Sequence, residues 1–172
     1  PQSFKSGLSG NEVAKAIEEG VLRMFPDAET VRMPVADGGD GTLEVLVQNT
    51  AGESFTKHVT GPLGELVSAS WGVMGDGKTV VIEMARASGL ALVDFRHSDP
   101  MVTTSYGTGE LIGEALDRGY RRMIVGLGGS ATNDGGVGMA QALGVKFLDS
   151  NGRDLRFGGG ALSKLARIDM SE

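Results

Sequence analysis

The sequence predicts an α/β fold built around a mixed β-sheet, and three observations support this prediction. Segments with the alternating pattern of strands are interleaved with segments whose apolar residues recur at helical spacing. Two alternating runs in the middle of the chain, Phe55 to Val59 and Val67 to Val73, are joined by Gly61-Pro62-Leu63-Gly64, which is typical of a turn between antiparallel strands. Glycine supplies 28 of the 172 residues and gathers in blocks between the patterned segments, where loops are expected.

The first helix is predicted by a capping box. Ser9-Gly10-Asn11-Glu12 has the serine and the glutamate that satisfy each other's backbone donors at a helix start. Apolar residues then follow at helical spacing, and Pro26 ends the element. Thr30 to Val35 is expected to form a short strand, followed by a loop of Asp and Gly and a short helix around Leu43 to Val47.

The second half of the chain continues the alternation of strands and helices. A glycine turn after residue 74 leads into an expected strand, Thr79 to Met84, which extends the antiparallel region. The expected elements that follow are a helix at Thr108 to Asp117, a strand at Arg122 to Val125, a helix at Val137 to Leu143 and a strand at Val145 to Leu148. The order of these elements is that of an α/β protein.

Composition excludes several classes of protein. A formal net charge of −6 and a pI of about 5.0 argue against a nucleic-acid partner. No apolar run approaches the roughly 20 residues that span a bilayer. The chain has no cysteine, which excludes disulfides and thiolate metal sites and fits a reducing compartment. We therefore expect a cytoplasmic protein without membrane or nucleic-acid partners; the sequence does not indicate an oligomeric state.

The chain is expected to be a fragment. It opens at Pro1, and its first loop leads directly into a helix without the buried strand that normally precedes such a loop in an α/β fold. The final residues stop as abruptly, at Met170-Ser171-Glu172.

One motif resembles a phosphate-binding loop but lacks its context. Gly72 to Thr79 matches the eight-residue pattern of that loop, in which a strand precedes and a helix follows. Here the β-branched run Thr79 to Ile82 follows, which favours a strand. We interpret the match as a turn between two strands.

A second motif, Gly126 to Ala131, fits the dinucleotide-binding fingerprint, and Asp149 lies near the spacing of a ribose-binding acid. Gly135 and Gly136 then fall where the phosphate-binding helix should begin, and each would cost that helix about 1 kcal/mol relative to Ala. A long anion-binding loop before a later helix is the more natural interpretation. An NAD-dependent oxidoreductase remains an alternative, as does a non-catalytic domain that binds a small acid.

Three loops combine anion donors with carboxylates. Ser3 to Ser9 places Lys5 just ahead of a helix N-terminus, which attracts phosphate or carboxylate. Pro34 to Thr42 places two acids, Asp37 and Asp40, at the end of an expected strand.

The third loop, Gly128 to Gly136, offers hydroxyls, an amide, one acid and many backbone N–H groups. Phosphoryl transfer requires positioned donors, a Mg²⁺ ion held partly by carboxylates, and a base beside the accepting hydroxyl. Each loop alone is more simply a capped turn, whereas the three together indicate phosphoryl transfer.

On these motifs the sequence resembles the bacterial type I glycerate kinase family over essentially its whole length. The family's Ser-Phe-Lys-Gly-Ser-Leu-Ser, Pro-Val-Ala-Asp-Gly-Gly-Glu-Gly-Thr, Gly-Pro-Leu-Gly and Gly-Gly-Ser-Ala-Thr-Asn-Asp-Gly-Gly segments all have counterparts here, as do residues 83–90 and 103–110. The chain departs from the pattern in three places. Ser6-Gly7 reverses the usual order, Asp40 stands where Glu is common, and Gln2 replaces an Asp.

The resemblance implies an ATP-dependent glycerate kinase that converts D-glycerate into 2-phosphoglycerate or 3-phosphoglycerate, with Mg²⁺ accompanying ATP. Family members are longer than this chain. They have two α/β domains, of which one is flavodoxin-like and is interrupted by the other. We expect residues 1–55 to belong to the flavodoxin-like domain and residues 56–172 to an incomplete second domain.

Site residues are assigned on the same hypothesis. Asp134 is the expected base, with capping of the helix at Val137 to Leu143 as its alternative role, and Lys5 supplies a second charge. Arg86 is a candidate for binding the glycerate carboxylate, or for a simple ion pair with Glu83. The residues expected to bind nucleotide or substrate are Ser3, Gly128, Gly129, Ser130, Thr132 and Asn133. The expected Mg²⁺ ligands are Asp37 and Asp40, which would otherwise only cap the following helix.

Overall fold

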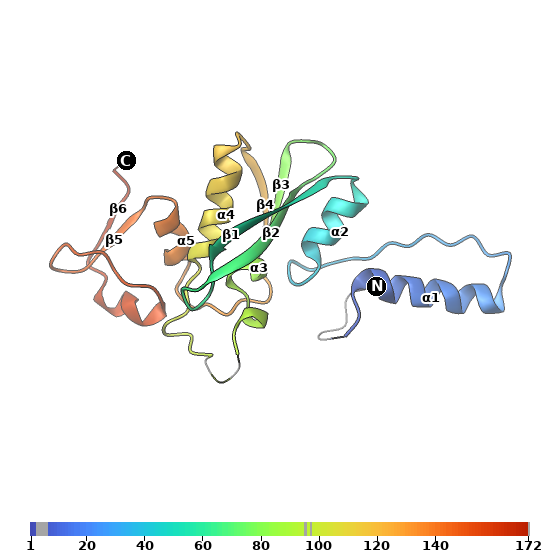
Figure 1. The fold of residues 1–172 in the computed structure, drawn as a ribbon, viewed down its shortest axis with the longest axis horizontal. Helices are drawn as coiled ribbons and strands as arrows, with labels where there is room; N and C mark the ends of the chain where they lie inside the picture. The colour runs from blue at the N-terminus through green and yellow to red at the C-terminus, as the bar shows by residue number, and fades with distance from the viewer. Residues whose placement is uncertain (3–6, 95, 97, 172) are drawn as a thin grey trace.

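The computed structural model describes residues 1–2, 7–94, 96 and 98–171. Lys5 and Ser3, two of the residues assigned to the site, lie outside these ranges. Figure 1 shows a central sheet with α1 toward one end of the molecule and the strands β5 and β6 toward the other. No helix within the described ranges is long and apolar enough to cross a membrane.

A four-stranded mixed sheet forms the centre of the fold. The strands lie in the order β1-β2-β3-β4, with bounds Glu53–Thr60, Leu66–Val73, Thr79–Glu83 and Arg122–Gly126. The pairs β1–β2 and β2–β3 are antiparallel, whereas β3 and β4 are parallel. The expected mixed sheet is therefore confirmed. The loop with the phosphate-binding pattern joins β2 to β3, so a strand follows it and not a helix, as the β-branched run predicted.

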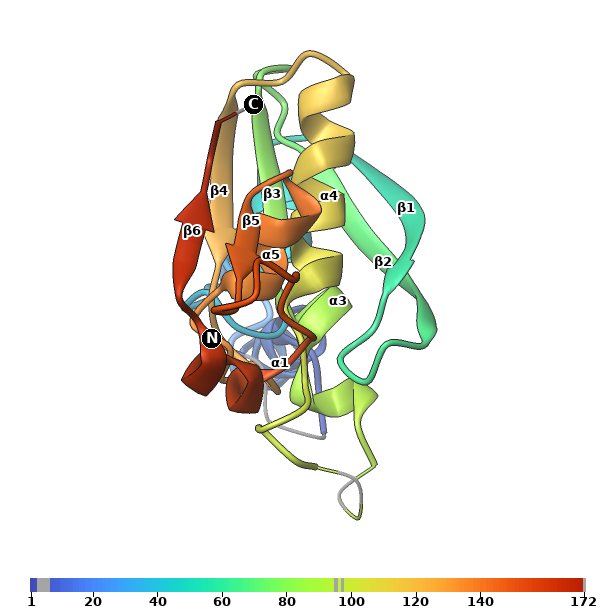
Figure 2. The same ribbon diagram turned by 90° about the vertical axis from the view of Figure 1, so that its left-hand side faces the viewer.

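Helices cover both faces of this sheet, as Figure 2 shows for α4 (Tyr106–Asp117). Side chains of a strand alternate between its two faces. Accordingly Val80 and Ile82 pack with α4 on one face, whereas Val81 packs with α2 (Thr42–Asn49) on the other. Because β3 is covered on both faces, all five of its residues are buried.

Helix α1 (Gly10–Met24) begins at the predicted capping box. Ser9 Oγ accepts from the backbone N–H of Glu12 at 3.3 Å, and the Glu12 carboxylate accepts from the backbone N–H of Ser9 at 2.7 Å. The helix and the segment after it expose several large apolar side chains, namely Ile17, Val21, Met24, Phe25, Val31, Met33 and Val35. The strand expected at Thr30 to Val35 is not assigned, because no other strand of the described chain lies beside it to complete its hydrogen bonds.

The C-terminal part carries α5 (Val137–Ala142), β5 (Lys146–Leu148) and a 3₁₀ segment, η3 (Gly159–Lys164). A last strand, β6 (Arg167–Asp169), pairs antiparallel with β5 and was not anticipated. The segment η3 was also missed, as were two other short elements, α3 (Ala85–Ser88) and η1 (Leu90–Leu92). The expected domain boundary at residues 55 and 56 falls within β1, and the division into two domains stays a prediction.

Candidate functional site

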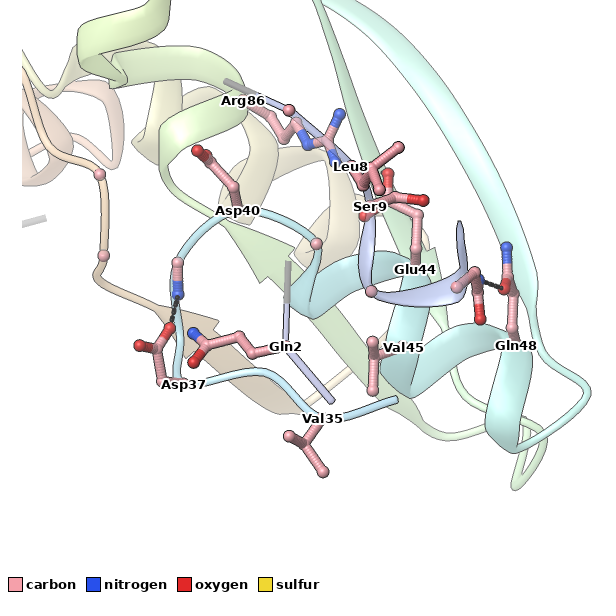
Figure 3. A pocket seen from close by; sticks show the side chains of 17 residues that line it. Gln2, Leu8, Ser9, Val35, Asp37, Asp40, Glu44, Val45, Gln48 and Arg86 are labelled. Atoms are coloured by element: carbon pink, nitrogen blue, oxygen red, sulfur yellow. Dashed lines mark hydrogen bonds and ion pairs between the residues drawn. The ribbon is translucent and has the colours of Figure 1, made fainter. Parts of the chain in front are cut away.

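A cavity of about 740 Å³ lies where several loops and helix ends meet. Helix α3 follows the carboxyl end of β3, and the loop with Gly128 follows the carboxyl end of β4. The carboxyl ends of parallel strands are the usual place for ligands in α/β sheets. The cavity is lined by residues from the start of α1, the Asp37–Gly41 loop, α2, α3 and the loop after β4, as Figure 3 shows in part. Five of the residues assigned to the site line it, namely Asp37, Asp40, Arg86, Gly128 and Gly129.

Two glycine loops meet backbone to backbone beside the cavity. The N–H of Gly128 donates to the carbonyl of Gly38 at 2.8 Å. A Cβ on Gly128 would lie 2.5 Å from the Cα of Gly39, so only glycine allows this approach. Gly129, the next residue, has a φ of +72° and lies against Asp40, whose Oδ1 would be 3.5 Å from an added Cβ. The close packing fixes the carboxylate loop relative to the loop after β4.

Asp37 and Asp40 both face the cavity. Asp37 Oδ1 accepts from the backbone N–H of Gly39 at 3.2 Å, while the Asp40 side chain is exposed and has no hydrogen-bond partner within the described ranges. Neither acid caps α2, because the N-cap is Gly41, and the carboxylate that accepts from the first turn is that of Glu83, which bonds to Leu43 N. The capping alternative is therefore not supported by the structure.

The two carboxylates suit a hard cation that takes oxygen ligands. The described residues contain no cluster of three or more His, Cys, Asp or Glu side chains that could hold a metal ion. A Mg²⁺ ion at Asp37 and Asp40 would therefore need further oxygens from water or phosphate, which is its usual environment in phosphoryl-transfer sites.

Arg86 reaches the cavity from α3 and is half-buried. Its Nε donates to Glu83 Oε1 at 3.2 Å, and its terminal nitrogen pairs with Glu44 Oε1. The ion pair with Glu83 considered from the sequence is thus formed, and the guanidinium also lines the cavity. Carboxylate binding by Arg86 stays a prediction.

Glu83 is the buried partner in this cluster and was not singled out as a site residue from the sequence. Its side chain is fully buried, and Oε2 accepts from the backbone N–H of Leu43 at 3.0 Å. Burial raises the pKa of Glu83, and the hydrogen bond from Leu43 and the charge of Arg86 oppose this rise only in part. The available signal was a carboxylate at the end of the otherwise apolar run Val80 to Ile82.

Asp134 lies elsewhere, buried between the loop after β4 and the start of α4. Its Oδ2 accepts from Ser105 N and Ser105 Oγ, both at 2.8 Å, and from Gly138 N at 3.1 Å, while Oδ1 accepts from Gly136 N at 3.1 Å. Asp134 does not line the cavity. The contacts expected of the capping alternative are present, and the role of Asp134 as a base stays a prediction.

The remaining polar residues of that loop also lie outside the cavity lining. Ser130 and Thr132 bond to each other, since Ser130 Oγ accepts from Thr132 N at 3.1 Å. Asn133 is exposed. The structure therefore separates Gly128 and Gly129, which face the cavity, from Ser130, Thr132 and Asn133, which do not.

Sequence reasoning missed several lining residues on α1 and α2. Asn11 Nδ2 donates to Gln48 Oε1 at 2.7 Å and so joins the start of α1 to α2 across the cavity wall. Glu44 lines the wall beside Gln48. The capping box located the start of α1, but nothing in the sequence indicated that α2 would lie beside it.

The chain is similar to known proteins over nearly its whole length. The model of the glycerate kinase family matches residues 1–172. Over 171 residues the chain is 58% identical to glycerate 2-kinase of Escherichia coli K12 and 58% identical to glycerate kinase of Bacillus subtilis 168, covering 99% of this chain and 45% of each relative.

A crystal structure assigned to glycerate kinase 2 of Salmonella typhimurium LT2 superimposes with a TM-score of 0.86 at 53% identity. The match covers 99% of this chain and 46% of that one. The chain thus spans less than half the length of the relatives it matches. The family model nevertheless matches residues 1–172, the whole of this chain, and the chain belongs to the glycerate kinase family.

Proposed function

We propose that the full-length protein containing this chain is a kinase that transfers the γ-phosphate of ATP to a hydroxyl of D-glycerate. The observation that carries this proposal is one cavity with carboxylates, Asp37 and Asp40, on one wall and a guanidinium, Arg86, on another. Phosphoryl transfer requires such a pairing of cation ligands with an anion-binding group. Family membership supports the same activity.

The product is proposed to be 2-phosphoglycerate. The relative from Escherichia coli is a glycerate 2-kinase by name and shares 58% of its aligned residues with this chain. Formation of 3-phosphoglycerate is the alternative. The acidic charge and the lack of cysteine support a cytoplasmic protein whose partners are ATP and D-glycerate and not nucleic acid.

Asp37 and Asp40 are proposed to hold Mg²⁺ together with oxygens from water and ATP. When bound, the ion neutralises charge on the phosphates. Gly129 lines the cavity without a side chain and so leaves room for phosphate oxygens close to the backbone. Ser3, Lys5, Gly128, Ser130, Thr132 and Asn133 remain proposed contributors to nucleotide or substrate binding.

Arg86 is proposed to bind the glycerate carboxylate. A guanidinium has five N–H donors in a planar fork that matches a carboxylate. Glu83 accepts from Nε and Glu44 from one terminal nitrogen, which leaves the other N–H groups of the guanidinium for a substrate. The start of α1 also lines the cavity, and a helix N-terminus favours an anion.

Asp134 is proposed as the base that accepts the hydroxyl proton, because it belongs to the loop after β4 that also contributes Gly128 and Gly129. Its Oδ1 accepts only one of the four hydrogen bonds and so has room for another donor, but to act the carboxylate would have to reach the cavity, which it does not line. The alternatives are Asp37 and Asp40, since both line the cavity, and a residue from the rest of the full-length protein.

The decisive experiment incubates the full-length protein with ATP, Mg²⁺ and D-glycerate and identifies the product by ³¹P NMR. The kinase proposal expects a phosphoglycerate signal and ADP only when glycerate is present. Binding of glycerate without ATP consumption would favour the non-catalytic alternative. Reduction of NAD⁺ by glycerate, measured by absorbance, would favour the oxidoreductase.

A further inference from the structure

Glu83 connects three elements around the cavity although its own side chain is buried beneath it. It ends β3, its Oε2 accepts from Leu43 N in the first turn of α2, and its Oε1 accepts from Arg86 Nε on α3. One carboxylate therefore fixes a side chain of the cavity wall relative to the helix that follows the Asp37–Gly41 loop.

Arg86 is held from two directions by carboxylates on different elements. Glu83 binds the Nε edge from β3, and Glu44 binds a terminal nitrogen from α2. A long arginine side chain otherwise samples many rotamers, and each immobilised side chain costs conformational entropy on binding a ligand. With both contacts present, the guanidinium is ordered before any ligand arrives. Figure 3 shows Arg86, Glu44 and Asp40 among the residues that line the cavity.

A buried glutamate at position 83 is not expected to make the fold more stable. A fully buried carboxylate loses its hydration, and the raised pKa of Glu83 shows that its partners do not fully compensate for this loss. An amide of the same shape would keep the hydrogen bond from Leu43 N without burying a charge. An amide has only one oxygen, however, so it could not accept from Leu43 N and from Arg86 Nε with two separate oxygens as the carboxylate does.

We infer that Glu83 is a positioning residue, which orients Arg86 so that its free N–H groups face the carboxylate of the substrate. The inference rests on the proposed glycerate kinase activity. Glu83 acts through Arg86 and does not itself touch the substrate. Glu44 supports the same orientation from the solvent side.

The test uses Glu83→Gln in the full-length protein. The amide oxygen can still accept from Leu43 N, but the NH₂ group then faces the Nε–H of Arg86, donor against donor. We expect the KM for glycerate to rise at least about tenfold, because a hydrogen bond to a charged group is lost, while the KM for ATP changes little. Thermal stability should be unchanged or higher, since Arg86 stays half-exposed and keeps Glu44 as a partner.

Two comparisons separate positioning from a general structural role. Glu114→Gln is the matched control, because Glu114 also pairs with two cations, Lys57 and Arg118, but lies on α4 away from the cavity. That variant should keep the wild-type KM for glycerate. In the double variant Glu83→Gln with Arg86→Lys, the KM for glycerate should equal that of Arg86→Lys alone, because Glu83 has no other route to the substrate.

An independent readout is the NMR signal of the Arg86 Nε–H group in arginine-labelled full-length protein. The signal is assigned as the one that disappears in Arg86→Lys. This signal should be protected from exchange in the wild type and should lose that protection in Glu83→Gln. Failure of the wild type to phosphorylate glycerate would overturn the proposed function, whereas the NMR comparison would still report whether Glu83 holds Arg86. The inference would be overturned if Glu83→Gln left the KM for glycerate or the Nε–H signal unchanged. It would also be overturned if the rise in KM in the double variant equalled the product of the rises in the two single variants.

Discussion

Asp134 accepts two hydrogen bonds from a single residue, Ser105, whose backbone N–H and Oγ both lie 2.8 Å from Asp134 Oδ2. Ser105 Oγ in turn accepts from the backbone N–H of Met139 in α5 at 2.9 Å. The pair therefore ties the loop after β4 to the starts of α4 and α5. Any test of Asp134 as a base has to separate this structural contribution from chemistry.

Asp134→Asn is expected to lower kcat by roughly 10²-fold or more if Asp134 is the base, because a lost general base costs about this much. The variant should also melt at a lower temperature, since the amide NH₂ group must face at least one of the four N–H or O–H donors. Activity should be measured well below the melting temperature, with secondary structure checked by circular dichroism.

Ser105→Ala is the matched control for Asp134→Asn. It removes one donor to Asp134 and the acceptor for Met139 N but leaves the carboxylate in place. It should lower stability without the large loss of kcat. Equal losses of kcat in the two variants would assign Asp134 a structural role and move the search for the base to Asp37 and Asp40.

Asp40→Asn is expected to raise the Mg²⁺ concentration that gives half-maximal activity, because an amide oxygen is a weaker ligand for a hard cation than a carboxylate. Folding should be unaffected, since Asp40 is exposed and does not cap α2. Asp117→Asn, at an exposed position on the last turn of α4, removes the same charge away from the cavity. A Mg²⁺ titration that gives the same curve for both variants would refute the metal role of Asp40.

Local signals made the hairpin and four of the helices, α1, α2, α4 and α5, predictable. The capping box at Ser9 and Glu12 forms within four residues, so its geometry depends little on the rest of the chain. The hairpin from Glu53 to Val73 is likewise encoded by alternation and by its turn. By contrast, β6 has three residues and exists only through its pairing with β5, some 20 residues earlier, which no local pattern announces.

The candidate site was predictable in its loops but not in its contacts. Glycines and acids indicated loops that line the cavity, which brings together Asp37, Asp40 and Gly129 from two of them. Which way each side chain faces depends on packing between distant elements. Asp134 turns toward α4 because Ser105 offers two donors there, and Glu83 is buried because α2 covers its face of the sheet. Neither relationship is visible in the sequence.

Gly129→Ala is expected to lower kcat/KM for ATP by about tenfold or more, because an added Cβ would occupy space where a phosphate oxygen must approach. The added Cβ would lie 3.2 Å from the Cβ of Ala85, and the residue's φ of +72° strains any L side chain. Gly144→Ala carries the matching backbone strain, with φ +96°, but its Cβ would meet no atom within 4 Å. Gly144 lies between α5 and β5, away from the cavity.

The comparison of these two glycine variants separates the effect of a side chain at the cavity from the effect of backbone strain. Both should lose stability, since alanine is strained at positive φ, and Gly129→Ala also carries the close contact with Ala85 Cβ. Only Gly129→Ala should lose activity at a temperature where both are folded. Parallel losses of activity in the two variants would mean that Gly129 matters for its conformation and not for a nearby ligand.

The last prediction concerns the pH dependence of stability and follows from the buried carboxyl of Glu83. Its pKa in the folded protein is raised above the ordinary value of 4.5 because burial disfavours the charged form. The folded protein therefore binds a proton at Glu83 more readily than the unfolded chain does. The stability linked to this proton is fully present below pH 4.5 and is lost as the pH rises through the folded-state pKa.

Glu83→Gln cannot titrate, so the wild type should gain stability relative to this variant as the pH is lowered from neutral toward 4.5. The difference in melting temperature, variant minus wild type, should accordingly be largest at neutral pH and shrink as the solution becomes more acidic. Other groups titrate in the same range, but they contribute equally to both proteins and cancel in the difference. Thermal melts of the two full-length proteins in matched buffers measure it. A difference that stays constant with pH would mean that the pKa of Glu83 is the same in the folded and unfolded protein, and a difference that grows toward acid would mean that folding lowers this pKa. Either result would show that Arg86 and Leu43 N compensate fully for the burial of Glu83.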